Sequence, residues 1–112
     1  MIKRKKPLNR FEGLWRLSEM AWDDDFLALV GDPVIRFGND GLGEFHFGAV
    51  DASIDYRVEE DKRGLVAEFS WEGFDDGSQV SGRGWAIWTD GQLRGKLFMH
   101  NGDESAFVAT MR

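Results

Sequence analysis

Apolar and polar residues alternate along most of this 112-residue chain. The alternation is clearest at residues 65–72, where every second side chain from Leu65 to Trp71 is apolar. A period of two points neighbouring side chains to opposite faces of a strand, so this segment predicts a half-buried β-strand. Alternation or short apolar runs predict seven more strands, at residues 10–20, 34–37, 42–50, 54–59, 82–88, 93–99 and 107–111.

Tight turns are expected between the last three strands, at Asp90-Gly91 and Asn101-Gly102. Such pairs favour type I′ turns, because both central residues need a positive φ. Elsewhere the sequence predicts a strand break at Asp51-Ala52, a charged turn from Glu60 to Gly64, and the longest polar connection from Gly73 to Ser81.

One short helix is predicted between the first two strands, over residues 22–31. Asp23 suits the N-cap, and Gly31 suits the position just after the last turn. An apolar stripe of Phe26, Leu29 and Val30 is expected to pack against one end of the sheet.

Together these elements predict an all-β protein: an eight-stranded antiparallel up-and-down barrel with one short helix between strands 1 and 2. Residues 11–112 form the single barrel domain, and residues 1–10 form a basic, flexible N-terminal tail. Closing the sheet removes the two edges that an open sheet exposes. Gly82, Gly84 and Gly95 lie inside predicted strands, where they let the sheet bend or leave room for a neighbouring ring.

Charge and composition narrow the classes of partner. Five of the fourteen basic residues lie in the first ten positions, which leaves nine against twenty acids and a net charge of −11 beyond them. Such a body repels phosphate backbones, so nucleic acid is an unlikely partner. No apolar run approaches the roughly 18 residues that span a membrane, and no secretory leader is recognisable, so a cytoplasmic location is expected.

Catalytic chemistry finds little support. The chain has no cysteine, and no serine lies in a Gly-x-Ser-x-Gly elbow. His46 and His100 lie on separate strands, and the acidic run at Asp23–Asp25 lacks the alternation of a calcium loop. We therefore assign no catalytic residue, no metal ligand and no cofactor, and the balance is against an enzyme.

Aromatic residues carry the strongest indication of a site. Inward rings could line a cavity for one small apolar ligand, or they could simply fill the barrel. The rings assigned to this cavity are Trp15, Phe45, Phe47, Phe69, Trp71, Trp85, Phe98 and Phe107. Trp85 and Trp88 cannot both point inward on a regular strand, so one of them is expected on the surface, where it would favour a homodimer.

The segment Phe11-Glu12-Gly13-Leu14-Trp15 resembles the Gly-x-Trp start of the calycin superfamily of lipocalins, fatty-acid-binding proteins and avidins. The resemblance implies a barrel-closing cation–π pair between Trp15 and a basic residue at the last strand, here Arg112. Other segments resemble a family of small uncharacterised bacterial proteins, and this resemblance implies no activity. The segments are Trp22–Leu27, Phe69–Gly73, Gly82–Ala86 and His100–Ser105.

Three hypotheses follow. The first is a binding barrel that holds a small apolar ligand, favoured by an interior cavity above about 300 Å³. The second is a structural homo-oligomer with a filled core and an exposed aromatic interface. The third is a hydrolase or metal-dependent enzyme, which requires His46 or His100 to converge with two carboxylates.

Overall fold

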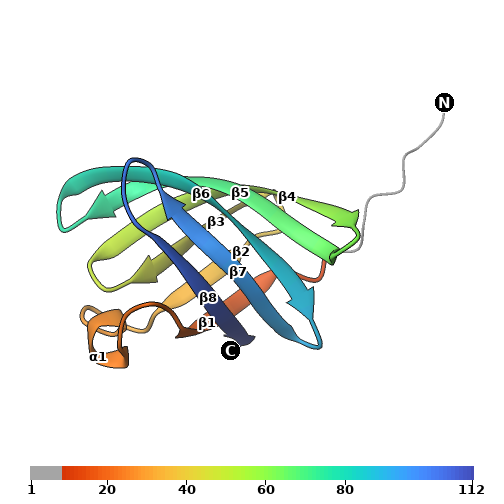
Figure 1. Cartoon of the computed structure of the whole chain (residues 1–112), viewed down its shortest axis with the longest axis horizontal. Coiled ribbons are helices and arrows are strands. Elements are labelled where there is room, and N and C mark those ends of the chain that lie inside the picture. Colours follow the sequence, from red (N-terminus) through yellow and green to blue (C-terminus); the bar gives the residue numbers. More distant parts are fainter. Residues whose placement is uncertain (1–8) are drawn as a thin grey trace.

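Eight antiparallel strands close into a barrel in the computed structural model, which describes residues 9–112. Each strand pairs with the next in sequence, and the last pairs with the first (Figure 1). This confirms the predicted up-and-down barrel. The elements are β1 (Gly13–Glu19), α1 (Asp24–Leu27), β2 (Val34–Phe37), β3 (Leu42–Phe47), β4 (Val50–Asp61), β5 (Gly64–Asp75), β6 (Ser78–Thr89), β7 (Gln92–Met99) and β8 (Glu104–Met111).

The inward side chains of all eight strands form one apolar core. Rings pack against each other in two groups along the barrel. Toward one end the ring of Phe37 packs against those of Phe11, Tyr56 and Phe69, with centroids between 4.8 and 6.0 Å apart. Edge-to-face contacts of this kind add to the stabilisation from burial.

Glycines inside the strands make room for these rings, as predicted. A Cβ added to Gly84 would lie 2.5 Å from Cζ of Phe69. A Cβ on Gly82 would lie 2.8 Å from Cζ2 of Trp71, and one on Gly95 would lie 2.9 Å from Cε2 of Phe107. Each inward ring therefore occupies the space that a side chain on the neighbouring strand would need.

One end of the barrel is covered by the start of the described chain. Asn9 donates a hydrogen bond from Nδ2 to the hydroxyl of Tyr56 at 3.0 Å, and that hydroxyl donates to the carbonyl of Gly38. The guanidinium of Arg10 lies 4.9 Å from the centre of the Trp88 ring. Residues 9 and 10, which the sequence analysis placed in the tail, therefore contact the barrel. The rest of the predicted tail lies outside the described residues.

The predicted connection from Gly73 to Ser81 is wrong. β5 and β6 continue through it and meet in a two-residue turn at Asp76-Gly77, both with positive φ (49° and 86°). The alternation was hidden because Val80 is the one aliphatic side chain among the inward positions of this hairpin. Asp90-Gly91 adopts the predicted turn, whereas at the next hairpin only Asn101 has a positive φ.

Two further breaks differ from the prediction. The chain turns at Gly48-Ala49, where Gly48 has a φ of 54°, so Asp51 and Ala52 lie inside β4 rather than breaking it. β4 also runs to Asp61, which shortens the predicted charged turn to two residues. Charged outward residues at the strand end caused this error.

The helix is one turn long and buries a different residue from those predicted. Leu27 is 1% exposed, whereas Leu29 and Val30 are 64% and 68% exposed. Asp23 caps the turn as predicted, since its Oδ1 accepts a hydrogen bond from the amide of Phe26 at 2.9 Å. The carbonyl of Leu27, the last residue of the helix, accepts a hydrogen bond from the amide of Gly48 at 2.8 Å. Within residues 9–112, no helix has the length and apolarity needed to cross a membrane.

Candidate functional site

Six of the eight predicted ring residues lie together inside the barrel. All six are at most 5% exposed and belong to the core: Trp15, Phe45, Phe47, Phe69, Trp71 and Phe107. The prediction was wrong for the other two, Trp85 and Phe98, because both side chains point outward from the barrel. Trp85 lies across from Glu68 and Lys96, between the buried Gly84 and Ala86.

Strand parity explains the error. Trp85 and Trp88 lie on opposite faces of β6, as expected, but the ring toward the interior is Trp88. Phe98 follows the buried Leu97 and therefore also points outward, where the guanidinium of Arg83 lies 5.9 Å from its ring. Neither outward ring can line an interior cavity.

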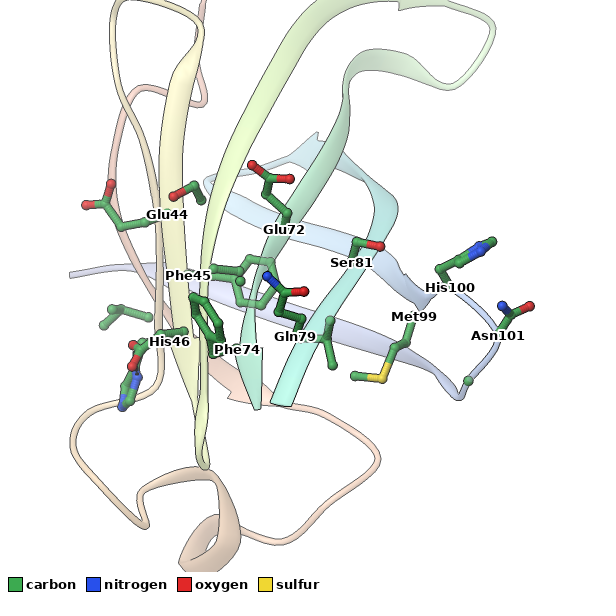
Figure 2. A pocket seen from close by; sticks show the side chains of 17 residues that line it. Glu44, Phe45, His46, Glu72, Phe74, Gln79, Ser81, Met99, His100 and Asn101 are labelled. Carbon is green, nitrogen blue, oxygen red and sulfur yellow. Dashed lines mark hydrogen bonds and ion pairs between the residues drawn. The ribbon is translucent and has the colours of Figure 1, made fainter. Parts of the chain in front are cut away.

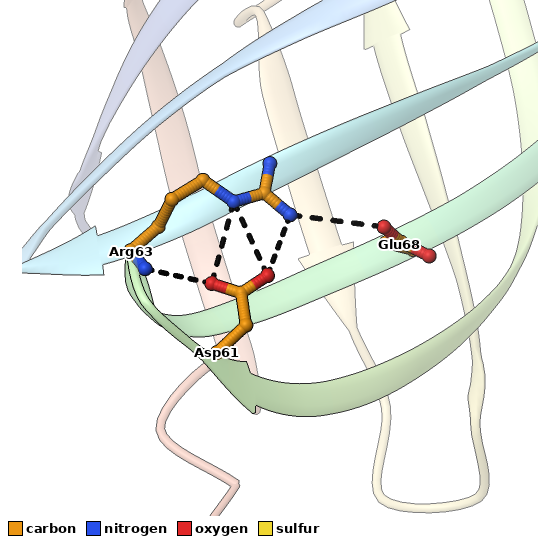
Figure 3. Close-up of polar contacts among 3 residues, drawn as sticks. All are labelled: Asp61, Arg63 and Glu68. Carbon is orange, nitrogen blue, oxygen red and sulfur yellow. Dashed lines mark hydrogen bonds and ion pairs between the residues drawn. The ribbon is translucent and has the colours of Figure 1, made fainter.

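Arg63 covers the outward Trp85 ring, with its guanidinium 5.6 Å from the ring centre. Asp61 holds that guanidinium through a 2.8 Å contact from Nη2, and Glu68 lies 3.9 Å away (Figure 3). The hydrogen bonds from Arg63 lower the pKa of Asp61. Trp85 is therefore half-buried rather than free, which weakens the expectation of an exposed tryptophan interface.

The barrel-closing pair of Trp15 and Arg112 does not form. Arg112 makes an ion pair with Asp32, with 2.5 Å between Nη1 and Oδ2. The buried Trp15 donates from Nε1 to the carbonyl of Phe11 at 2.7 Å. The cation–π contact at a barrel end is instead the one between Arg10 and Trp88.

A hollow at the other end of the barrel is lined by residues of the segment that contains α1 and of the β5–β6 and β7–β8 hairpins. Figure 1 shows α1 and the two hairpin turns at this same end. We call this hollow the mouth pocket. Its volume is about 220 Å³. Its apolar lining consists of Met20, Trp22, Phe26, Phe47, Val50, Trp71, Leu97 and Met99.

A ladder of rings leads from the surface through this pocket into the core. Phe26 and Trp22 have ring centroids 5.7 Å apart, and Trp22 stacks on Phe47 at the same spacing. Phe47 stacks on Phe45, which packs edge-on against Trp71 at 5.1 Å. The segment that contains α1 thus forms one wall of the pocket and rests on the core rings.

Backbone contacts fix this wall in place. The hydroxyl of the buried Ser105 accepts a hydrogen bond from the amide of Ala21 at 3.0 Å. Leu27 anchors the wall from the other side through its buried side chain and its bond to Gly48. The pocket is therefore built from fixed elements on both sides.

Every charged residue that lines the mouth pocket is acidic: Asp75, Asp103 and Glu104. Asp75 lies opposite Val50 in the strand register, and Val50 points inward, so Asp75 occupies an inward position at the end of β5. Glu104 lies opposite the outward Phe98, and Lys96 is 3.9 Å from its carboxylate. The rim can therefore offer hydrogen-bond acceptors to a ligand held by the apolar wall.

A larger, open hollow follows the outer face of the sheet across β3, β4, β5 and β6 (Figure 2). We call it the outer groove; its lining includes Glu44, His46, Asp51, Ser53, Phe74, Gln79, Ser81 and His100. Its charged groups are partly paired: Nδ1 of His46 lies 2.6 Å from Oδ1 of Asp51. A bidentate contact between Arg36 and Glu44 lowers the pKa of Glu44.

His46 and His100 lie on opposite sides of the outer groove (Figure 2). They therefore do not converge, and His46 contacts one carboxylate rather than the two that the third hypothesis required. Within residues 9–112, no group of three or more acidic or histidine side chains is arranged to hold a metal ion.

Most of the mouth pocket could not be predicted from the sequence. Met20, Leu97 and Met99 lie in no recognisable motif, and Trp22 lies at the start of the predicted helix. The position of Asp75 could have been found, because continuing the alternation of Phe69 and Trp71 by four residues places it on the inward face. Comparisons with protein-family models, curated proteins and solved structures found no match.

Proposed function

We propose that this chain is a small cytoplasmic binding barrel of the calycin type, and that its ligand is a small apolar molecule held in the mouth pocket. The observation that carries the proposal is an opening lined by eight apolar side chains, with a ring ladder as its wall. Ligand sites are concave, mostly apolar and largely pre-formed, and this pocket has those properties. The closed barrel and the Gly-x-Trp segment at Gly13–Trp15 support the likeness to calycins.

The volume limits the ligand to a few carbon atoms. The mouth pocket, at about 220 Å³, is smaller than the interior cavity of about 300 Å³ that the first hypothesis named, so it suits only a molecule below drug size. Burying six methylene-sized groups at about 0.8 kcal/mol each gives at most roughly 5 kcal/mol, so a Kd of about 0.2 mM is the tightest that this burial allows. Association itself costs free energy, so we expect a six-carbon alcohol such as 1-hexanol to bind with a Kd of about 1 mM or weaker.

Isothermal titration with 1-hexanol tests this proposal. The Met99→Trp variant should lose binding, because a larger ring at Met99 fills the mouth pocket. Leu14→Trp is the matched control: Leu14 is exposed on β1 and does not line the pocket, so binding should be unchanged. Equal binding by both variants would contradict the proposal.

A self-associating protein is the second candidate, favoured by two exposed apolar side chains beside the outer groove. Phe74 is 51% exposed and Leu42 is 53% exposed, although large apolar side chains usually lie inside. Sedimentation should then show a dimer that Phe74→Ser weakens and that Leu29→Ser, at the α1 end, does not. A monomer at every accessible concentration would refute this candidate.

A further inference from the structure

We propose that the ligand of the mouth pocket is an amphiphilic amine, with an apolar chain against the rings and a protonated ammonium group at Asp75 and Asp103. This inference rests on the proposed function and specifies the chemical class of its ligand. Three observations carry it: the inward position of Asp75, the negative sign of every charge at the rim, and the apolar side chains that line the rest of the pocket.

Asp75 is unusual in its place. It occupies an inward position, in register with the buried Val50, and the residue is partly buried. Among residues 9–112, no side chain makes a hydrogen bond or an ion pair with its carboxylate. An unpartnered carboxylate beside an apolar pocket can form a charge-assisted hydrogen bond with the cationic group of a ligand held there.

Asp103 completes the acceptor set at the β7–β8 turn. Its backbone carbonyl accepts a hydrogen bond from the amide of Met99, which fixes the turn beside the pocket, while its side chain is exposed. Glu104 contributes less, because it stands on the outer face near Lys96. An ammonium group has three donors and no acceptor, so it matches a rim that offers carboxylate oxygens alone.

The rest of the molecule strengthens the preference for a cation. The chain beyond its first ten residues carries a net charge of −11, which raises the local concentration of cations at the surface. No basic residue lines the mouth pocket, so an anionic head group would meet only like charges. A fatty acid is therefore a poor ligand, although its chain would fit the same wall.

Three ligands with the same chain separate these contributions: hexylammonium, 1-hexanol and hexanoate, each titrated into the whole protein at pH 7. We expect hexylammonium to bind about two- to fivefold more tightly than hexanol, as solvent-exposed charge pairs allow, and hexanoate to bind most weakly. Raising the salt concentration to 1 M should reduce the difference in affinity between hexylammonium and hexanol, because salt screens the charge pair. The affinity for hexanol itself should stay the same or rise.

Conservative variants locate the effect. Asp75→Asn and Asp103→Asn should each reduce the preference for the amine while hexanol still binds. Asp90→Asn removes the same charge at the opposite end of the barrel, in the β6–β7 turn, and should leave the preference intact. Thermal unfolding of each variant checks that the barrel is folded.

The outcomes distinguish the two proposals. Equal affinity for hexylammonium and hexanol, or tighter binding of hexanoate, would overturn the amine assignment and leave the binding function standing. Binding of none of the three ligands would overturn both. An amine preference that Asp90→Asn also removes would overturn the assignment to Asp75 and Asp103, because it would reflect net charge alone.

Discussion

Gly82 offers the sharpest test of how the sheet is built around its rings. In Gly82→Ala the new methyl group would overlap the carbonyl oxygen of Phe98 and approach Cζ2 of Trp71 to 2.8 Å. The carbonyl belongs to the β7 backbone and cannot move without disturbing the ladder between β6 and β7. Trp71 also lines the mouth pocket, so the substitution affects both the stability and the site.

The magnitude follows from two opposing effects. Overpacking of this kind costs about 1–3 kcal/mol, and the loss of chain entropy in the unfolded state returns about 0.4–1 kcal/mol. We therefore expect Gly82→Ala to lower the free energy of unfolding by about 1–2 kcal/mol, or roughly 4–9 °C in Tm for a domain of this size.

Gly31→Ala is the matched control, because the nearest atom to its added Cβ is Nε2 of His46 at an ordinary 3.8 Å. Its φ is not in the left-handed region, so the same substitution should be neutral or stabilise by about 0.4–1 kcal/mol. Urea unfolding at 25 °C measures both variants. Equal stabilities of Gly82→Ala and Gly31→Ala would refute the argument that a ring and a neighbouring strand occupy the space over Gly82.

Three further predictions concern the ends and the surface of the barrel. Tyr56→Phe removes the hydroxyl that joins Asn9 to Gly38, and should lower the free energy of unfolding in urea by about 1–3 kcal/mol. A decrease below about 0.5 kcal/mol would contradict a stabilising role for these two hydrogen bonds. Leu27→Ala should cost about 2–5 kcal/mol, because Leu27 is buried, whereas Leu29→Ala should change stability by less than about 0.5 kcal/mol; similar losses would place both residues in the core. The hydrogen bonds from Arg36 lower the pKa of Glu44 in the folded state. The pair therefore stabilises the fold fully at pH values above the ordinary carboxyl pKa, and this stabilisation is lost as the pH falls through the lowered pKa of Glu44. Both partners are exposed, so solvent screening limits the contribution to about 0.2–1 kcal/mol at pH 7, and the stability difference between wild type and Glu44→Gln should vanish toward pH 3; a difference that grows on acidification would contradict the sign.

The barrel could be predicted from the sequence because its strands carry a period of two and some of its hairpins carry Asp-Gly or Asn-Gly pairs. The prediction failed where one of these patterns was interrupted. The hairpin at Asp76-Gly77 was missed because its inward positions include glycine and Asp75 rather than a run of apolar residues. The break at Gly48 was misplaced because Asp51 is polar, although an outward residue of β4 is expected to be polar.

The candidate site was harder to predict, because it depends on which face each ring occupies and on what covers the barrel end. Parity within one strand correctly separated Trp85 from Trp88, but it did not say which of the two faces inward; the buried neighbours of Trp85 decide that in the structure. The contact between Trp22 and Phe47 joins segments that are 25 residues apart, and no local pattern indicates it. The ion pair between Arg112 and Asp32 likewise joins distant segments, and no local pattern indicates it.

The central claim is that the mouth pocket takes up a small apolar ligand, and the methionine methyl groups test it directly. Met20 and Met99 line the pocket, whereas Met111 is exposed on β8 and does not. In a titration of protein carrying ¹³C-labelled methionine methyls with 1-hexanol, the account predicts saturable shifts of the Met20 and Met99 resonances and none for Met111. Met99 also lines the outer groove, so a Met99 shift without a Met20 shift would place the ligand there and contradict the claim. Shifts that are confined to Met111, or the absence of any saturable shift, would also contradict it.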